Sequence, residues 1–81
     1  MREHLRYHVT RHMALRLLER KISLEHAKNV VHYGVEEKQL RRGGNGGILT
    51  QFAKTDCGRK LVVIAEIKNN DCWLATVYYE Y

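Results

Sequence analysis

The residues best suited to chemistry are His12, Arg16 and Arg20, which follow one another at intervals of four residues. On a helix this spacing brings one imidazole and two guanidinium groups onto the same side. An imidazole titrates near neutral pH, and arginine binds phosphate oxygens through paired hydrogen bonds. The three residues therefore suit chemistry on a phosphodiester, although an ordinary solvent-facing helix surface has the same pattern.

A helix over residues 11–20 is expected to position these side chains. Thr10 is a good N-cap for it, because its hydroxyl can accept a hydrogen bond from a free amide of the first turn. A second helix is expected over residues 24–33, with Ser23 as its N-cap and Gly34 ending it in a conformation of positive φ. The apolar stripe predicted for the first helix contains Met13, Ala14, Leu17 and Leu18.

The last third of the chain is expected to form strands over residues 48–54, 60–68 and 72–79. A three-residue turn at 69–71 would pair four residues of one strand with four of the next on a single face that the helices cover. The predicted pairs are Leu61 with Tyr79, Val63 with Val77, Ala65 with Ala75 and Ile67 with Trp73. Tyr79 is accordingly assigned to the core.

The start of the chain and the glycine run give weaker signals. Residues 1–9 alternate between apolar and polar side chains, which fits a short strand or an extended arm. The glycine run at 43–47 lacks the ending of a nucleotide-binding loop and is expected to be a mobile connection. The predicted fold class is α+β: two N-terminal helices packed on one face of a C-terminal antiparallel β-meander of three to four strands.

Length and charge limit the possible functions. The 81 residues form one domain, 1–81, and carry a formal charge of +5 with five histidines uncounted. A surface this basic attracts polyanions, of which nucleic acid is the commonest in a cell. No signal peptide is recognisable, and no apolar run approaches the roughly 20 residues that span a bilayer, so a cytoplasmic location without membrane contact is expected. The candidate nucleic-acid contacts are His8, Arg11, Arg41, Arg42 and Lys60.

The cysteines and histidines favour neither a disulfide nor a metal site. Cys57 and Cys72 should lie at opposite ends of a strand, roughly 25 Å apart at the usual rise per residue, so both are predicted to be free thiols. His4, His8 and His12 are also four residues apart, but they lack carboxylate partners, so no metal site is predicted.

One motif of this chain resembles a bacterial family, domain of unknown function 4258, which is similar to the BrnT and RelE toxins. Those toxins are small metal-independent ribonucleases. The matching positions are Thr10, His12, Arg16, Arg20, Ile22 and Ser23, together with Thr76 near the end of the chain. Where the family usually has glycine after the second arginine this chain has Lys21, so the turn into Ile22 is expected to form without positive φ.

The resemblance implies a RelE/BrnT-like fold and a metal-independent endoribonuclease that acts as a bacterial toxin, in a toxin-antitoxin system or as a polymorphic toxin. It implies an RNA substrate, an antitoxin or immunity protein as partner, and no small-molecule cofactor. His12, Arg16, Arg20 and Thr76 would act on the phosphodiester, and Tyr78 or Thr76 could orient a phosphate. The alternatives are a non-catalytic basic module that binds nucleic acid or an acidic protein, and a subunit that pairs through its sheet.

Overall fold

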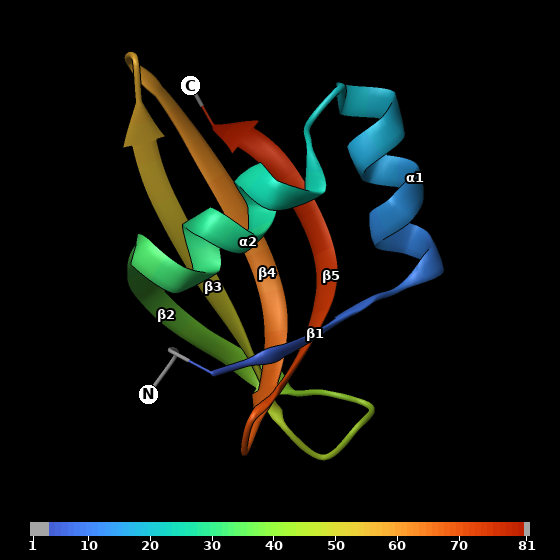
Figure 1. Cartoon of the computed structure of the whole chain (residues 1–81). Helices are drawn as coiled ribbons and strands as arrows, with labels where there is room; N and C mark the ends of the chain where they lie inside the picture. Colours follow the sequence, from blue (N-terminus) through green and yellow to red (C-terminus); the bar gives the residue numbers. More distant parts are fainter. Residues whose placement is uncertain (1–3, 81) are drawn as a thin grey trace.

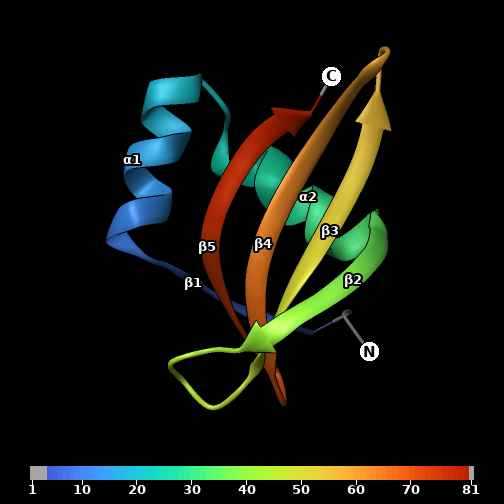
Figure 2. The same ribbon diagram turned by 180° about the vertical axis from the view of Figure 1, so that it is seen from behind.

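The computed structural model describes residues 4–80. Figure 1 shows two helices on one side of a twisted sheet, and Figure 2 shows that no helix covers the other side. The elements in chain order are β1 (Arg6–Val9), α1 (Arg11–Arg20), α2 (Leu24–Tyr33), β2 (Val35–Arg42), β3 (Ile48–Asp56), β4 (Arg59–Lys68) and β5 (Asp71–Glu80).

The sheet corrects the predicted fold class. It has five strands in the order β1-β5-β4-β3-β2, and β1 runs parallel to β5 whereas the other pairs are antiparallel. The domain is α+β, but an antiparallel meander of three to four strands is wrong. Strand β1 pairs with a strand from the other end of the sequence: Arg6 lies opposite Asp71. Strand β2 is exposed along its whole length and interrupted by two register shifts, so it lacks the alternation by which strands are recognised.

The predicted bounds of both helices are confirmed, as are their N-caps. The Thr10 hydroxyl accepts a hydrogen bond from the amide of Met13 (3.1 Å) and donates one to the carbonyl of Leu74 (2.8 Å). Ser23 accepts from the amide of His26 in the same way (3.0 Å). Thr10 therefore both begins α1 and fixes it to β5.

The two helix ends differ from expectation. Lys21 adopts the left-handed conformation (φ 56°), so the turn into Ile22 does use positive φ. Gly34 is extended (φ −77°, ψ 179°), and its role is to allow close packing. A Cβ there would lie 2.3 Å from the carbonyl oxygen of Val30 and 2.6 Å from that of Ala53, which no other residue could accommodate without a backbone shift.

The core lies between the helices and one face of the sheet. Helix α2 packs against β3 and β4, whereas α1 packs mainly against β5. Because α1 lies beside this strand, its predicted apolar stripe is only partly covered: Met13 is fully buried and Leu17 partly, but Ala14 is exposed and Leu18 is 78% exposed. The buried residues of this core are Met13, Ile22, Ala27, Val30, Val31, Phe52, Leu61, Val63, Ala65, Cys72, Leu74 and Val77.

The register between β4 and β5 is as predicted at one end of the hairpin only. Leu61–Tyr79 and Val63–Val77 pair as expected, and Tyr79 packs partly buried against the core. The turn, however, contains two residues, Asn69 and Asn70, and a bulge at Ala75 restores the register further along. The pairs actually formed near the turn are Ala65–Leu74 and Ile67–Cys72. Trp73 is therefore on the face of the sheet that the helices leave open, and Leu74 and Cys72 are buried instead.

The glycine run is organised by a buried carboxylate. Glu66, only 4% exposed, accepts hydrogen bonds from the backbone amides of Asn45 (2.8 Å) and Gly47 (2.7 Å) and from the side-chain amide of Asn45 (3.1 Å). Residues 43–47 thus form a turn wrapped around Glu66, where an unconstrained connection was expected. Their amides are used to bind an internal anion.

Candidate functional site

Arg20 attaches helix α1 to the edge of β5. Arg20 donates a hydrogen bond from Nη1 to the carbonyl oxygen of Val77 (2.9 Å), the residue between Thr76 and Tyr78. Arg20 and Tyr78 also line one surface hollow. Of the predicted catalytic residues, the structure therefore brings Arg20, Thr76 and Tyr78 to one segment of the sheet edge.

Arg16 and His12 lie one and two turns before Arg20 on α1. Arg16 is 32% exposed and donates from Nη1 to the carboxylate of Glu19 (2.6 Å). His12 is exposed at the start of the helix, and within residues 4–80 no hydrogen bond or ion pair involves its side chain. The row of His12, Arg16 and Arg20 on α1 consequently contains an imidazole without a partner, a guanidinium paired with one carboxylate, and a guanidinium anchored to β5.

The structure adds Arg59 and Tyr79 to this region. The Arg59 guanidinium lies 3.7 Å from the centre of the Tyr79 ring, in cation–π contact, and both residues line the hollow with Arg20 and Tyr78. Neither was predicted as a site residue. The correctly predicted pairing of Leu61 with Tyr79 could have indicated the contact, because Arg59 shares a face with Leu61 and is the diagonal neighbour of Tyr79.

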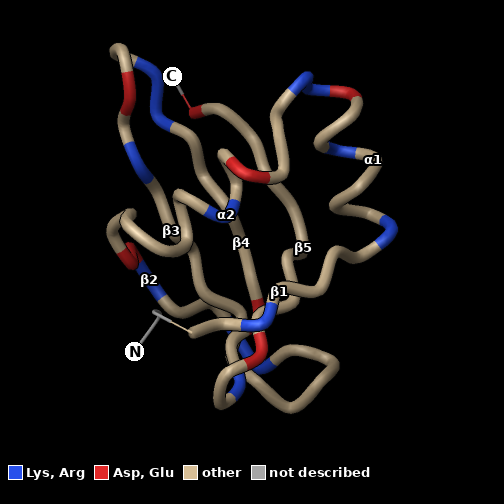
Figure 3. Tube along the Cα trace, in the orientation of Figure 1, with Lys and Arg blue, Asp and Glu red and all other residues tan. Residues whose placement is uncertain are grey.

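The predicted nucleic-acid contacts are not gathered in one place. Arg11 is exposed on α1, but Arg41 and Arg42 lie on β2, at the opposite edge of the sheet. Lys60 bonds the carboxylates of Glu37 (2.6 Å) and Glu80 (2.9 Å), and the hydrogen bond to Glu37 is the main reason that the pKa of its ammonium is raised. Figure 3 shows basic positions recurring along α1. Of these predicted contacts, only Arg11 therefore lies on that helix.

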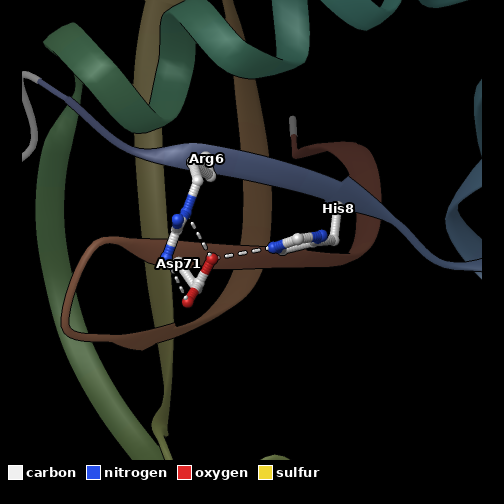
Figure 4. A network of polar contacts seen from close by, with 3 residues as sticks. All are labelled: Arg6, His8 and Asp71. Carbon is white, nitrogen blue, oxygen red and sulfur yellow. Dashed lines mark hydrogen bonds and ion pairs between the residues drawn. The ribbon is translucent and has the colours of Figure 1, made fainter.

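The remaining predicted contact, His8, belongs to a polar network on the open face of the sheet (Figure 4). Its Nε2 is 2.9 Å from Asp71 Oδ1, and Arg6 donates two hydrogen bonds to the same carboxylate (3.0 and 3.1 Å). The hydrogen bond with His8, followed by that from Arg6, lowers the pKa of Asp71. The His8 ring also stacks on Trp73, with centroids 5.2 Å apart and planes inclined by 21°.

The three evenly spaced histidines do not form a common helical face. His8 is in β1 and His12 in α1, on either side of the Thr10 cap. Across residues 4–80, no group of three or more His, Cys, Asp or Glu side chains could hold a metal ion. Both cysteines are free, as predicted: Cys57 is exposed in the turn between β3 and β4, and Cys72 is buried.

These features define a small α+β domain with a basic helix along the edge of a five-stranded sheet. The chain belongs to the family described as Domain of unknown function (DUF4258), whose model matches residues 9–79. The match includes all of α1 and nearly all of β5, and hence every predicted catalytic residue. No curated protein and no solved structure matches the chain. None of the helices in the described part of the chain is long and apolar enough to cross a membrane.

Proposed function

We propose that this protein is a metal-independent endoribonuclease, similar to the BrnT and RelE toxins, that acts as a bacterial toxin in the cytoplasm. One observation carries the proposal. His12, Arg16 and Arg20 form a row along α1, which starts at the unpartnered imidazole and ends where Arg20 donates to the carbonyl of Val77, between Thr76 and Tyr78. One imidazole, two guanidinium groups and two hydroxyl groups thus lie on two adjoining elements.

The proposed reaction uses the 2′-hydroxyl of RNA as its nucleophile. His12 removes the proton from this hydroxyl, and the oxygen attacks the adjacent phosphorus. The bond from phosphorus to the 5′-oxygen breaks, and the leaving oxygen takes a proton from water. The products are a 2′,3′-cyclic phosphate and a free 5′-hydroxyl, and the imidazolium returns its proton to solvent.

The arginines supply the positive charge that this reaction needs. A guanidinium has five N–H donors, and Arg20 donates one of these hydrogen bonds to the carbonyl of Val77, which leaves donors for a phosphate and fixes the direction of the group. Arg16 lies one turn away and can exchange Glu19 for a phosphate oxygen. Thr76 and Tyr78 flank the anchored carbonyl and are assigned to orienting the phosphate.

The basic side of α1 also suggests how the toxin would be silenced. An antitoxin or immunity protein that placed acidic side chains over Arg16 and Arg20 would compete directly with RNA. In this proposal such a protein is the physiological partner, and no cofactor takes part.

Incubation of the purified protein with RNA in EDTA tests the proposal. Cleavage is expected to leave 2′,3′-cyclic phosphate ends, and His12→Ala should lower the rate by about 10²- to 10⁴-fold. The variant should stay folded, because substitution of an exposed side chain usually changes stability by no more than about 0.5 kcal/mol. His26→Ala, which removes a histidine from α2, is the matched control and should retain activity.

Two results would overturn catalysis at this site. If wild-type protein binds RNA without cleaving it, the protein is a basic binding module. If His12→Ala stays folded and cleaves at the wild-type rate, the reaction occurs elsewhere. The toxin role is tested by expression in bacteria, where the wild-type protein should arrest growth and His12→Ala should not.

A further inference from the structure

We propose that the stacked rings of His8 and Trp73 form a binding site for one unpaired nucleobase of the RNA, next to the start of α1. The inference rests on the proposed function and makes it more specific, because a base that stacks on these rings cannot at the same time be part of a duplex. The substrate would therefore be single-stranded RNA.

The ring stack is fixed before any ligand binds. Parallel pairing of β1 with β5 places His8 beside Trp73, and the two rings are nearly parallel with centroids 5.2 Å apart. The carboxylate of Asp71 is 2.9 Å from His8 Nε2 and holds the plane of the imidazole, while Arg6 holds the carboxylate through two hydrogen bonds. Figure 4 shows both side chains directed at Asp71.

The stack is also accessible. Both rings lie on the face of the sheet without helices, where the His8 side chain is 45% exposed and Trp73 is partly exposed. Each ring offers a π-face that any base can contact, so such a site is tolerant of sequence. Because Asp71 already orients His8, little side-chain entropy remains to be lost when a base binds.

The stack lies close in the fold to the start of α1, which holds the row of His12, Arg16 and Arg20. Trp73 precedes Leu74, whose carbonyl accepts the hydrogen bond of the Thr10 hydroxyl, and Thr10 caps the helix two residues before His12. A strand of RNA with phosphates along α1 would thus bring a base to the stack. Asp71 does not oppose this approach, because its charge is paired with Arg6.

Trp73 is the only tryptophan of the chain, so its fluorescence reports directly on this site. The experiment titrates His12→Ala, which should consume the probe about 10²- to 10⁴-fold more slowly than the wild type, with a single-stranded oligoribonucleotide of mixed sequence. Saturable quenching is expected with the single strand. The same sequence as a blunt duplex should bind more weakly and leave the fluorescence unchanged. Saturation of binding without quenching would refute the site.

Substitutions provide the second measurement, with binding followed by the anisotropy of the labelled oligoribonucleotide. Trp73→Leu should weaken binding about 5- to 150-fold, the usual cost of losing one base–aromatic stack. His8→Ala should weaken it in the same direction. Tyr33→Leu is the matched control, since it removes a 68%-exposed aromatic ring at the end of α2 and should leave affinity unchanged.

Failure of this inference can be told from failure of the proposed function. Quenching and dependence on Trp73 without cleavage by the wild-type protein would retain the base site and remove the ribonuclease. Cleavage that retains its wild-type kcat/KM in folded Trp73→Leu would retain the ribonuclease and refute the base site. If Trp73→Leu does not fold, the quenching measurement on His12→Ala decides.

Discussion

Replacement of Glu66 tests whether one buried carboxylate organises the loop at residues 43–47. In Glu66→Ala the buried amide of Gly47 loses its acceptor, which costs about 1–3 kcal/mol. The lost γ-methylene adds about 1 kcal/mol. The amide of exposed Asn45 can turn to water, so the expected total is about 2–4 kcal/mol.

Glu66→Gln separates charge from shape. The glutamine can still accept hydrogen bonds from the loop, but it loses the charge that makes such bonds about twice as strong, so we expect a loss of about 1 kcal/mol. Urea unfolding at pH 7 measures both changes, with Glu36→Ala on the exposed strand β2 as a surface control expected within about 0.5 kcal/mol of wild type. If Glu66→Ala were as stable as that control, the carboxylate would not hold the loop.

The loop also offers a matched pair of glycine substitutions. In Gly47→Ala the new Cβ would lie 2.5 Å from the carbonyl oxygen of Ile67 and 2.9 Å from Glu66 Cγ, so the backbone must move. We expect a loss of more than about 2 kcal/mol, in the range of severe local clashes. In Gly44→Ala no heavy atom lies within 4 Å, and stability should hardly change. Equal effects of the two substitutions in urea unfolding would contradict the packing described.

Two further predictions concern titratable groups. The contacts with His8 and Arg6 lower the pKa of Asp71, so its contribution to stability should be present above the ordinary carboxyl pKa and lost as pH falls through the lowered value. The urea midpoints of wild type and Asp71→Asn should therefore differ at pH 7 and converge in acid. A difference that stays constant with pH would contradict this. Burial raises the pKa of the Cys72 thiol to about 12, so a thiol reagent at pH 8 should label only exposed Cys57 in the folded protein. In urea the reagent should label both thiols. Rapid labelling of both thiols without denaturant would show that Cys72 is not buried.

The local parts of this fold were predictable because their signals lie within a few residues. Both helices begin after a hydroxyl side chain that caps them, and the spacing of apolar residues defined their length. The four-residue spacing of His12, Arg16 and Arg20 likewise required only a helix. The proximity of Arg20 to Thr76 and Tyr78 was implied by the family resemblance alone, since it depends on where α1 docks.

Two of the errors share a physical cause, which is that the deciding partner is distant in sequence. Parallel pairing of β1 with β5 joins the two ends of the chain, and Glu66 orders a glycine run some twenty residues before it. The bulge at Ala75 has a different, local cause: one extra residue in β5 reverses the faces of Trp73 and Leu74 relative to a regular strand. The base site inferred above was consequently invisible in the sequence, where Trp73 was assigned to the core.

Helix α1 both covers the edge of β5 and carries residues of the proposed site, and Arg20 takes part in both. Strand β1 ends at Val9, opposite Leu74, and beyond that point no strand among residues 4–80 pairs with the outer edge of β5. The helix takes over there: Thr10 donates to the carbonyl of Leu74, and Arg20 donates to that of Val77. Edge carbonyls that would otherwise be open to another strand are thereby satisfied. Arg20 is consequently part of the fold as well as of the proposed site, so its replacement would affect both stability and activity. The His12 side chain makes no hydrogen bond or ion pair within the described chain, so its replacement tests the chemistry alone.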